Sequence, residues 1–278
     1  MRNEGYVQKV YQELHAQPEL PLEEVRTAAY VADELKEMGF SVSTQVGGNG
    51  VVGVFEIGGS GLTLGLRCDM DALPITEATG VEFKSQNSGV MHACGHDSHM
   101  AMVLAACRYA VENRERLSGK LMAVFQPAEE IGVGAKAMLE AGLFASGKPD
   151  RFVGVHNNPA LPVGTLGLQA GSISAYTDQF QATFVGLGGH GALPHRTKDP
   201  IAMATAGVQN AFALVQRRTK AGYPMVLSFG VIQGGTTFNI IPEEVSVAGT
   251  VRTSRPEDQD LMIRLLNQAF KSAADLHE

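Results

Sequence analysis

The chain has 278 residues, of which 44% are hydrophobic and 18% are charged, as in an ordinary globular protein. Its formal net charge is −7 and its longest apolar run covers residues 100–107, so neither nucleic-acid binding nor a membrane span is expected. Three cysteines cannot all pair and no basic-then-apolar leader opens the sequence. We therefore expect a soluble cytoplasmic protein of about two domains.

The first part of the chain predicts an α/β fold. Apolar residues recur at helical spacing over residues 7–14 and 22–38, and the runs 51–57 and 62–66 read as two strands around a tight glycine turn. Helices and strands then alternate, which favours a largely parallel sheet. The expected elements are a helix over 98–111, a strand over 121–125, a helix over 132–141, and strands over 152–155 and 163–168.

The pattern changes near Gly171 and predicts a second domain with the order β-α-β-β-α. Its expected elements are a strand over 178–185, a helix over 200–217, strands over 225–232 and 245–251, and a final helix that begins near Ser254. The split unit of ferredoxin-like folds needs one more strand. We therefore expect the sequence to be a fragment of a longer protein.

The densest group of potential metal ligands lies just before the helix at 98–111. His92, Cys94, His96 and His99 fall within eight residues, in a chain with eight histidines and three cysteines. Thiolate and imidazole both bind borderline-soft divalent ions. An incidental run of histidines at a helix start is the less favoured interpretation.

Two further groups follow predicted strands. Glu129 and Glu130 come after the strand at 121–125, and His156 ends the strand at 152–155. Each signal is weak alone, because paired glutamates are usually solvated and a lone histidine is usually structural. Glu130 lies 36 residues after Cys94, and His156 lies 26 residues after Glu130. Each step is one β-α unit of roughly 30 residues, so the side chains should meet at the carboxyl ends of neighbouring strands.

Two other segments carry polar side chains whose roles remain open. Asp69 and Asp71 follow the strand at 62–66 and could either orient a ligating histidine or form a turn. His190 lies in a glycine-rich turn that lacks the lysine of a phosphate-binding loop. It could stabilise an oxyanion or belong to a plain turn.

Five segments in this order, 67–74, 92–97, 126–130, 155–157 and 188–192, resemble the amidohydrolase branch of the aminoacylase/carboxypeptidase metallopeptidases. This branch contains hippurate hydrolases, N-acetyl-amino-acid deacetylases and indole-acetyl-amino-acid hydrolases, and the resemblance covers the whole chain. It implies an α/β catalytic domain with a mixed, largely parallel sheet flanked by helices over 1–171. It also implies an inserted ferredoxin-like α+β lid and dimerisation domain over 172–278, and hence a homodimer.

The resemblance also implies the roles of individual residues. Two divalent ions, Mn, Zn or Co, would be bound by Cys94, His96, Glu130 and His156, with Glu129 as general base and Asp69 as an acid that supports the site. Three lid residues, His190, Asn239 and Arg252, would contact the substrate. Relatives supply a further histidine ligand from a segment beyond the lid, which this sequence lacks.

The expected reaction is hydrolysis of the amide bond of an N-acyl-amino acid. Two alternatives remain at this point. One is a carboxypeptidase or aminopeptidase that acts on short peptides, and the other is a non-catalytic metal-binding dimer, favoured by the absent C-terminal segment.

Overall fold

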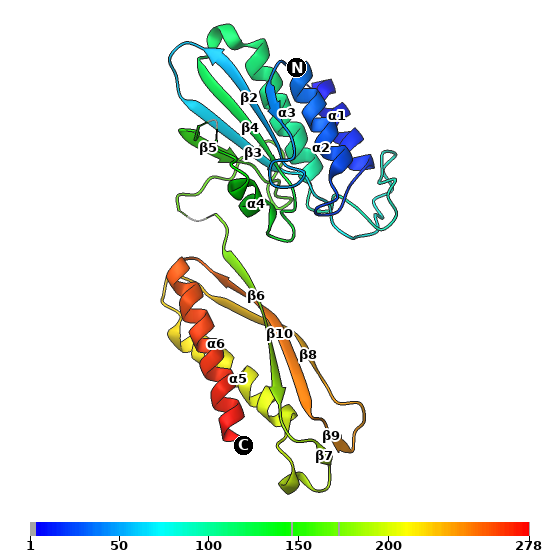
Figure 1. The fold of residues 1–278 in the computed structure, drawn as a ribbon, viewed down its shortest axis with the longest axis vertical. Helices are drawn as coiled ribbons and strands as arrows, with labels where there is room; N and C mark the ends of the chain where they lie inside the picture. The colour runs from blue at the N-terminus through cyan, green and yellow to red at the C-terminus, as the bar shows by residue number, and fades with distance from the viewer. Residues whose placement is uncertain (1–3, 146, 172, 278) are drawn as a thin grey trace. The chain divides into compact units, whose positions relative to one another are not determined.

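The computed structural model describes residues 4–145, 147–171 and 173–277. The chain forms two compact units, residues 1–164 (unit 1) and 165–278 (unit 2), each with its own sheet and core (Figure 1). This division falls slightly before the expected one, and Ser172, the first residue of the expected second domain, lies outside the described residues. In the described part of the chain, no helix has the length and apolar character needed to span a bilayer.

Unit 1 contains a mixed five-stranded sheet with the order β1-β2-β4-β3-β5. The strands are β1 (Ser41–Ser43), β2 (Val51–Gly58), β3 (Thr63–Asp69), β4 (Gly119–Gln126) and β5 (Arg151–Gly154). The helices are α1 (Glu4–Ala16), α2 (Val25–Glu37), α3 (His96–Glu112), the short 3₁₀ helix η1 (Arg114–Arg116) and α4 (Gly134–Glu140). The pairs β1–β2 and β2–β4 are antiparallel, whereas β4–β3 and β3–β5 are parallel, so parallel pairing is less dominant than expected.

The two strands expected around a tight turn are not neighbours in the sheet. β4 lies between β2 and β3 and pairs with both. The link over residues 59–62 therefore spans two strand spacings, about 10 Å. It passes so close to β4 that a Cβ on Gly61 would lie 2.8 Å from the backbone nitrogen of Gly119. A glycine-rich link thus permits a crossover that resembles a hairpin turn in the sequence.

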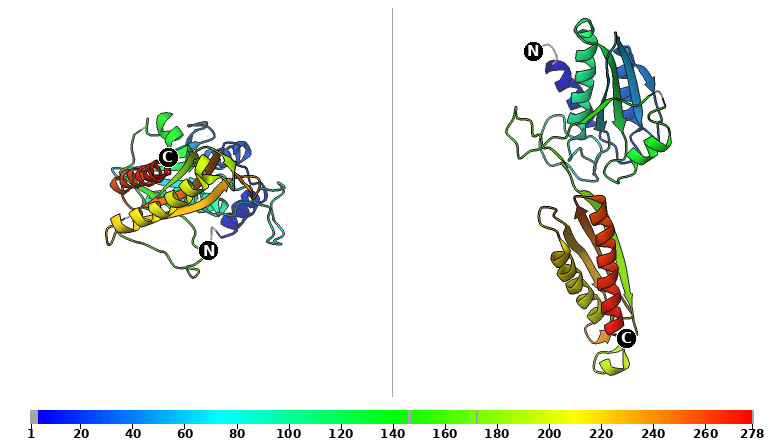
Figure 2. Two further views of the ribbon diagram at one scale, coloured as in Figure 1. Left: turned by 90° about the horizontal axis from the view of Figure 1, so that it is seen from below. Right: turned by 90° about the vertical axis from the view of Figure 1, so that its left-hand side faces the viewer.

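The sheet of unit 1 is covered by helices on both faces, as Figure 2 shows. Leu121, Ala123 and Phe125 of β4 pack against α1, α2 and α3, whereas Met122 and Val124 pack against α4 and the segment after it. Because successive side chains of a strand point to opposite faces, one apolar strand contributes to both cores. This is why β4 reads as an unbroken apolar run in the sequence.

One expected strand is absent and two expected helices begin later than predicted, for local reasons. No strand forms over 163–168, where Val163 and Leu168 are exposed and offer no buried face to a neighbouring strand. α2 begins at Val25 because Leu22 has a φ of 70°, which a right-handed helix cannot contain. α4 begins at Gly134 because Gly132 also has a φ of 70°.

Unit 2 contains an antiparallel sheet with the order β6-β10-β8, on which two helices pack. Its strands are β6 (Tyr176–Val185), β8 (Val226–Gly234) and β10 (Glu244–Thr253), with a separate two-stranded ribbon of β7 (Gly189–His190) and β9 (Ile240–Ile241). Its helices are the 3₁₀ helix η2 (Pro194–Arg196), α5 (Pro200–Arg218) and α6 (Pro256–Leu276).

A buried histidine ties α1 to α3 and makes the stability of unit 1 depend on pH. The Nδ1 atom of His15 lies 2.6 Å from Oδ2 of Asp97, and its Nε2 atom lies 3.2 Å from Oε1 of Glu77. The hydrogen bond to Asp97 outweighs burial and, with Glu77, raises the pKa of His15 above its usual 6.5. Its contribution is therefore complete below pH 6.5 and is lost as the pH rises through the raised pKa.

We expect His15→Gln to lower the free energy of unfolding most at pH 5.5 to 6.5, by about 1 to 3 kcal/mol, and progressively less at higher pH. Urea unfolding of both proteins from pH 5.5 to 9 measures this difference. The control His195→Gln removes an exposed histidine and should change stability little at any pH. A His15→Gln effect that grows with pH would contradict the assignment.

Candidate metal centre

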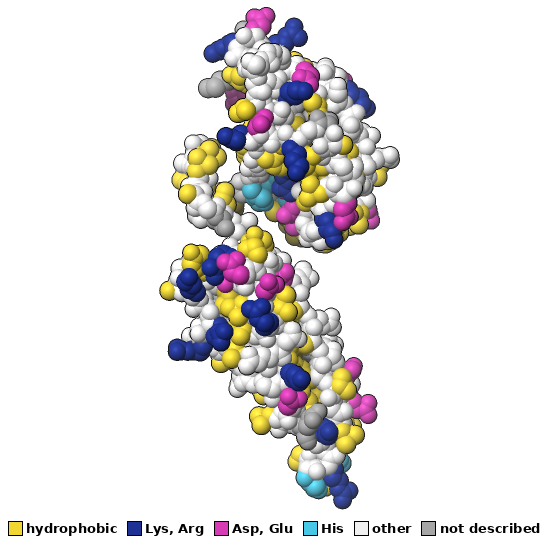
Figure 3. Space-filling view, turned by 60° about the vertical axis from the view of Figure 1, so that its left-hand side comes forward, with side chains coloured by type: hydrophobic (Ala, Val, Ile, Leu, Met, Phe, Trp, Pro, Cys, Tyr) yellow, Lys and Arg dark blue, Asp and Glu magenta, His cyan; other side chains and the backbone are white. Residues whose placement is uncertain are grey.

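The candidate site lies where the three parallel strands of unit 1 end. Asp69, the last residue of β3, is in register with Gln126, the last residue of β4, and Gly154 of β5 pairs with Arg67 of β3. The segments that carry Glu129, Glu130 and His156 therefore leave the sheet at one edge. In the space-filling view, histidine and acidic side chains lie next to each other on the surface of unit 1 (Figure 3).

A glycine at the start of α3 brings the cysteine-histidine segment to the same edge. Gly95 precedes α3 with a φ of 85°, a conformation that favours glycine. A Cβ at this position would lie 1.9 Å from Nδ2 of Asn157, so a larger residue would push α3 away from the segment after β5. This close approach places Cys94 and His96 beside His156.

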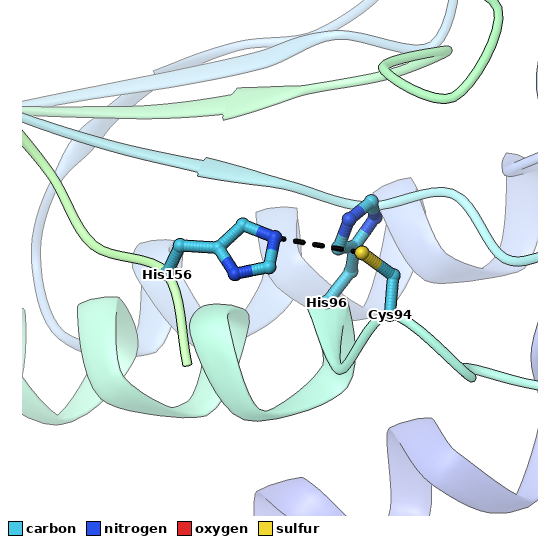
Figure 4. A group of neighbouring side chains, drawn as sticks. All are labelled: Cys94, His96 and His156. Atoms are coloured by element: carbon cyan, nitrogen blue, oxygen red, sulfur yellow. Dashed lines mark hydrogen bonds between the residues drawn. The ribbon is translucent and has the colours of Figure 1, made fainter. Parts of the chain in front are cut away.

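The cysteine and the two histidines point toward one another (Figure 4). The Cys94 thiol donates to Nε2 of His156 at 3.4 Å, and one ligand atom from each of the three residues lies within 4.8 Å of the others. On the other side of His96, its Nε2 atom is 3.7 Å from Oε1 of Glu130 and 4.0 Å from Oε2 of Glu129. The structure thus brings together the four expected ligands and the expected base.

Backbone carbonyls fix the orientation of both imidazole rings. Nδ1 of His96 donates to the carbonyl of Asp71 at 2.8 Å, and Nδ1 of His156 donates to the carbonyl of Asn157 at 2.8 Å. A carbonyl can only accept, so each neutral ring carries its proton on Nδ1. Both Nε2 atoms then present lone pairs to the cluster, as metal-ligating histidines do.

Two buried acceptor atoms of the cluster bear on whether a metal ion fits there. Nε2 of His96 and Oε1 of Glu130 have no hydrogen-bond partner among the described residues, although both are shielded from solvent. Two acceptors that face each other without a donor are costly to bury. A cation between them removes this cost, and the sulfur, nitrogen and oxygen donors suit a borderline-soft divalent ion.

The charges around the cluster change the pKa values of its members. Burial, followed by the negative charge of Glu130, raises the pKa of the Cys94 thiol to about 12. Burial and the charge of Glu130 also raise the pKa of Glu129. In contrast, burial favours the protonated form of Asp69, but the hydrogen bond from His99, with the electrostatic attraction of His96 and Arg67, outweighs burial and lowers the pKa of Asp69 to about 2.

Asp69 and His99 form a supporting pair beneath the cluster. Nδ1 of His99 donates to Oδ1 of Asp69 at 2.7 Å, and Nε2 of His99 accepts from the backbone N–H of Asn157 at 2.9 Å. Both nitrogens of His99 are therefore used within the protein, so this ring orients the segment after His156 and offers no free atom to a metal. His99 belongs to the predicted cluster of potential metal ligands but had no individual role there, although its i+3 spacing from His96 on one helix face points to the same edge.

Asp71 and Arg67 complete the support. Oδ2 of Asp71 accepts from the backbone N–H of Glu130 at 2.9 Å. Arg67 donates to Oδ2 of Asp69 at 2.8 Å and to Oε1 of Gln126 at 2.6 and 3.0 Å. Both aspartates therefore support the site: Asp69 holds His99, and Asp71 holds the segment that carries Glu130.

The three expected substrate contacts lie in unit 2, at two different ends of its sheet. The β7–β9 ribbon pairs His190 with Ile240, and the backbone N–H of Gly191 donates to the carbonyl of Asn239 at 2.9 Å, so His190 and Asn239 are neighbours. Arg252 lies near the other end of β10, where it donates to Oγ1 of Thr177 at 3.0 Å.

The separation of these two groups follows from the length of β10. Glu244, at the start of β10, closely follows β9, and Arg252 is eight residues further along the strand. At about 3.3 Å per residue, the two ends are about 26 Å apart. The structure therefore brings His190 and Asn239 together and places Arg252 away from them.

Comparison with known proteins shows what this chain is similar to. It is 38% identical over 275 residues to hippurate hydrolase of Campylobacter jejuni, covering 99% of this chain and 71% of that protein. It is 41% identical over 240 residues to N-acetyl-L-cysteine deacetylase of Bacillus subtilis, covering 86% of this chain and 57% of that protein. It is 38% identical to thermostable carboxypeptidase 2 of Saccharolobus solfataricus, covering 95% of this chain and 68% of that protein.

The same relationship is found among solved structures. The Bacillus subtilis protein YXEP, a dinuclear metal-binding peptidase of the M20 family, superposes with a TM-score of 0.81 at 32% identity, covering 98% of this chain and 70% of that one. Peptidase family M20/M25/M40 matches residues 65–275, which include every residue of the candidate site. The chain therefore belongs to peptidase family M20/M25/M40 and is a metal-dependent hydrolase of the amidohydrolase and peptidase type.

Proposed function

We propose that the protein hydrolyses the amide bond of N-acyl-amino acids, with water as the second substrate and a carboxylic acid and an amino acid as products. The observation that carries this proposal is the convergence of Cys94, His96, Glu130 and His156 beside the partly exposed carboxylate of Glu129. Two relatives support the substrate class, because hippurate and N-acetyl-L-cysteine are both N-acyl-amino acids.

The site would hold two divalent ions. The thiol of Cys94 and the Nε2 atoms of His96 and His156 favour Zn or Co, whereas the carboxylate of Glu130 suits Mn. Bound ions of this kind acidify water and polarise a carbonyl group. Asp69 acts behind the ligands, since its carboxylate is held by His99 and Arg67.

Glu129 would move the proton in the reaction. Its side chain is 41% exposed and makes no hydrogen bond among the described residues, so it can reach a water molecule and a substrate. Burial and the charge of Glu130 raise its pKa, which strengthens it as a base. Glu129 would take a proton from the attacking water and give it to the nitrogen of the leaving amino acid.

Unit 2 would act as a ferredoxin-like lid, with residues 1–171 as the catalytic domain and residues 172–278 as the lid and dimerisation domain. Nδ1 of His190 accepts from the backbone N–H of Ala192 at 3.1 Å, which leaves Nε2–H free to stabilise an oxyanion. Arg252 and Asn239 would bind the substrate carboxylate, for which a guanidinium is well suited.

A homodimer is part of this proposal. About 26 Å of β10 separates the end near His190 and Asn239 from Arg252, and this exceeds the length of a small acyl-amino acid. We propose that one end of a lid serves one substrate and that the other end serves the site of a partner subunit. A cytoplasmic location remains part of this proposal.

The other candidate function is hydrolysis of short peptides, favoured by the 38% identity to a thermostable carboxypeptidase. Comparing N-acetyl-amino acids, benzoyl-glycine and dipeptides with the metal-loaded full-length protein separates the two. We expect kcat/KM for the acyl-amino acids to exceed that for dipeptides by about tenfold or more. The reverse order would assign the protein as a peptidase, and metal binding without turnover of any substrate would leave a non-catalytic dimer.

Replacing the proposed base tests the mechanism. We expect Glu129→Gln to lower kcat by about 10²- to 10⁴-fold while metal content and folding are preserved, because the amide cannot accept the proton. Steady-state kinetics and elemental analysis measure both quantities. The control Glu140→Gln changes an exposed glutamate on α4 and should leave kcat unchanged. Near-normal turnover of Glu129→Gln would reject the assignment.

Replacing the thiol tests the ligand set. We expect Cys94→Ser to weaken binding of Zn or Co by at least about tenfold, because a hydroxyl is a poor substitute for a thiolate. Competition with a chromophoric chelator measures the affinity. Cys107→Ala is the control, because it changes a cysteine in the apolar core of unit 1 and should lower stability without changing metal affinity. Equal affinities of Cys94→Ser and the unmodified protein would exclude Cys94 as a ligand.

A further inference from the structure

A fully buried carboxylate lies behind the segment that carries Glu129 and Glu130. Glu24 is 0% exposed and immediately precedes α2. Oε1 of Glu24 accepts from the backbone N–H of Ala128 at 2.7 Å, and its Oε2 atom accepts from Nδ2 of Asn49 at 3.0 Å. Both donors are neutral, and no basic side chain of the described residues pairs with Glu24. Burying a carboxylate without a cation is costly, so the burial of Glu24 calls for an explanation.

The reason lies in the backbone of Ala128. This buried residue has a φ of 49°, in the left-handed region that residues other than glycine rarely adopt. Its carbonyl accepts from the backbone N–H groups of Val133 and Gly134, at 3.3 and 3.2 Å. With its N–H bound by Glu24, both polar backbone groups of Ala128 are satisfied in this strained conformation.

The next turn of the chain is held in the same way. The backbone N–H of Glu130 donates to Oδ2 of the buried Asp71 at 2.9 Å. Glu129 thus lies between two residues, Ala128 and Glu130, whose N–H groups are bound by carboxylates from distant parts of the chain. The two contacts hold the backbone on both sides of Glu129.

We propose that Glu24 is a positioning residue for the candidate site, an inference that rests on the proposed roles of Glu129 and Glu130. Glu24 contacts neither the ligands nor the substrate. It stabilises the left-handed conformation of Ala128, and this conformation turns the chain after β4 so that both glutamates face His96. Partners of this kind commonly change metal affinity or activity by about 10- to 100-fold, and small displacements of a catalytic group have comparable effects.

Two conservative variants separate the effect of the length of the Glu24 side chain from the effect of its charge. Glu24→Gln keeps an acceptor oxygen for the N–H of Ala128 but loses the charge and the acceptor for Nδ2 of Asn49, whereas Glu24→Asp keeps the charge and is one methylene too short. If Glu24 acts by accepting the hydrogen bond of Ala128, kcat and metal affinity of the Glu24→Gln variant should stay within about threefold of those of the unmodified protein. The Glu24→Asp variant should lose about tenfold in both, with little change in KM.

Glu19→Gln is the matched control. The Glu19 carboxylate accepts from the backbone N–H and the hydroxyl of Thr27 at 2.8 Å, so it supports the start of the same helix without touching residues 126–130. We expect this variant to lower the melting temperature without changing kcat or metal affinity.

The measurements use the full-length protein: chelator competition for Zn²⁺ affinity, steady-state hydrolysis of an acyl-amino acid, and circular dichroism for the folded fraction. The inference is overturned if Glu24→Asp retains kcat and affinity while Glu24→Gln loses them, or if both variants match Glu19→Gln. Loss of the proposed function itself shows differently, as normal turnover of Glu129→Gln. Zn²⁺ affinity reports on Glu24 even then, because it does not depend on turnover.

Discussion

Two backbone carbonyls determine what the candidate site can do. The carbonyls of Asp71 and Asn157 accept hydrogen bonds from Nδ1 of His96 and of His156, respectively. The Nε2 lone pair of His96 therefore faces Glu130, and that of His156 faces Cys94. If either ring turned over, it would present an N–H to the cluster and repel a cation. The remaining contacts of the site serve to keep these carbonyls and their segments in place.

Much of the candidate site could be predicted from the chain alone, because a parallel sheet repeats a simple rule. Each β-α unit of roughly 30 residues returns the chain to the same edge, so Cys94, Glu130 and His156 were expected to meet there. Their convergence in the structure follows from the register of β3, β4 and β5. The rule concerns strand ends, and it identifies only residues that directly follow a strand or precede a helix.

The roles of two other supporting residues, His99 and Glu24, could not be found in this way. The role of His99 depends on Asp69 and on the backbone of Asn157, and the role of Glu24 depends on the conformation of Ala128, more than 100 residues away. Such contacts are set by tertiary packing. The cluster and the i+3 spacing place His99 near the site but do not give its partners, and no local pattern distinguishes Glu24 from a solvated glutamate. The expected strand over 163–168 failed for a related reason, because an apolar run forms a strand only where a neighbour buries it.

The insertion of β4 between β2 and β3 constrains how unit 1 is assembled during synthesis. β2 and β3 are complete by residue 69, but the strand that joins them ends at Gln126. Until then the two have no partner in common, and their unpaired edges are open to wrong contacts. The helix α3, made in between, can cover the apolar faces of this unfinished sheet but cannot close it. The nascent chain can therefore join β2 to β3, and gain the edge that carries the glutamates, only after β4 has been made, through contacts between residues far apart in the sequence.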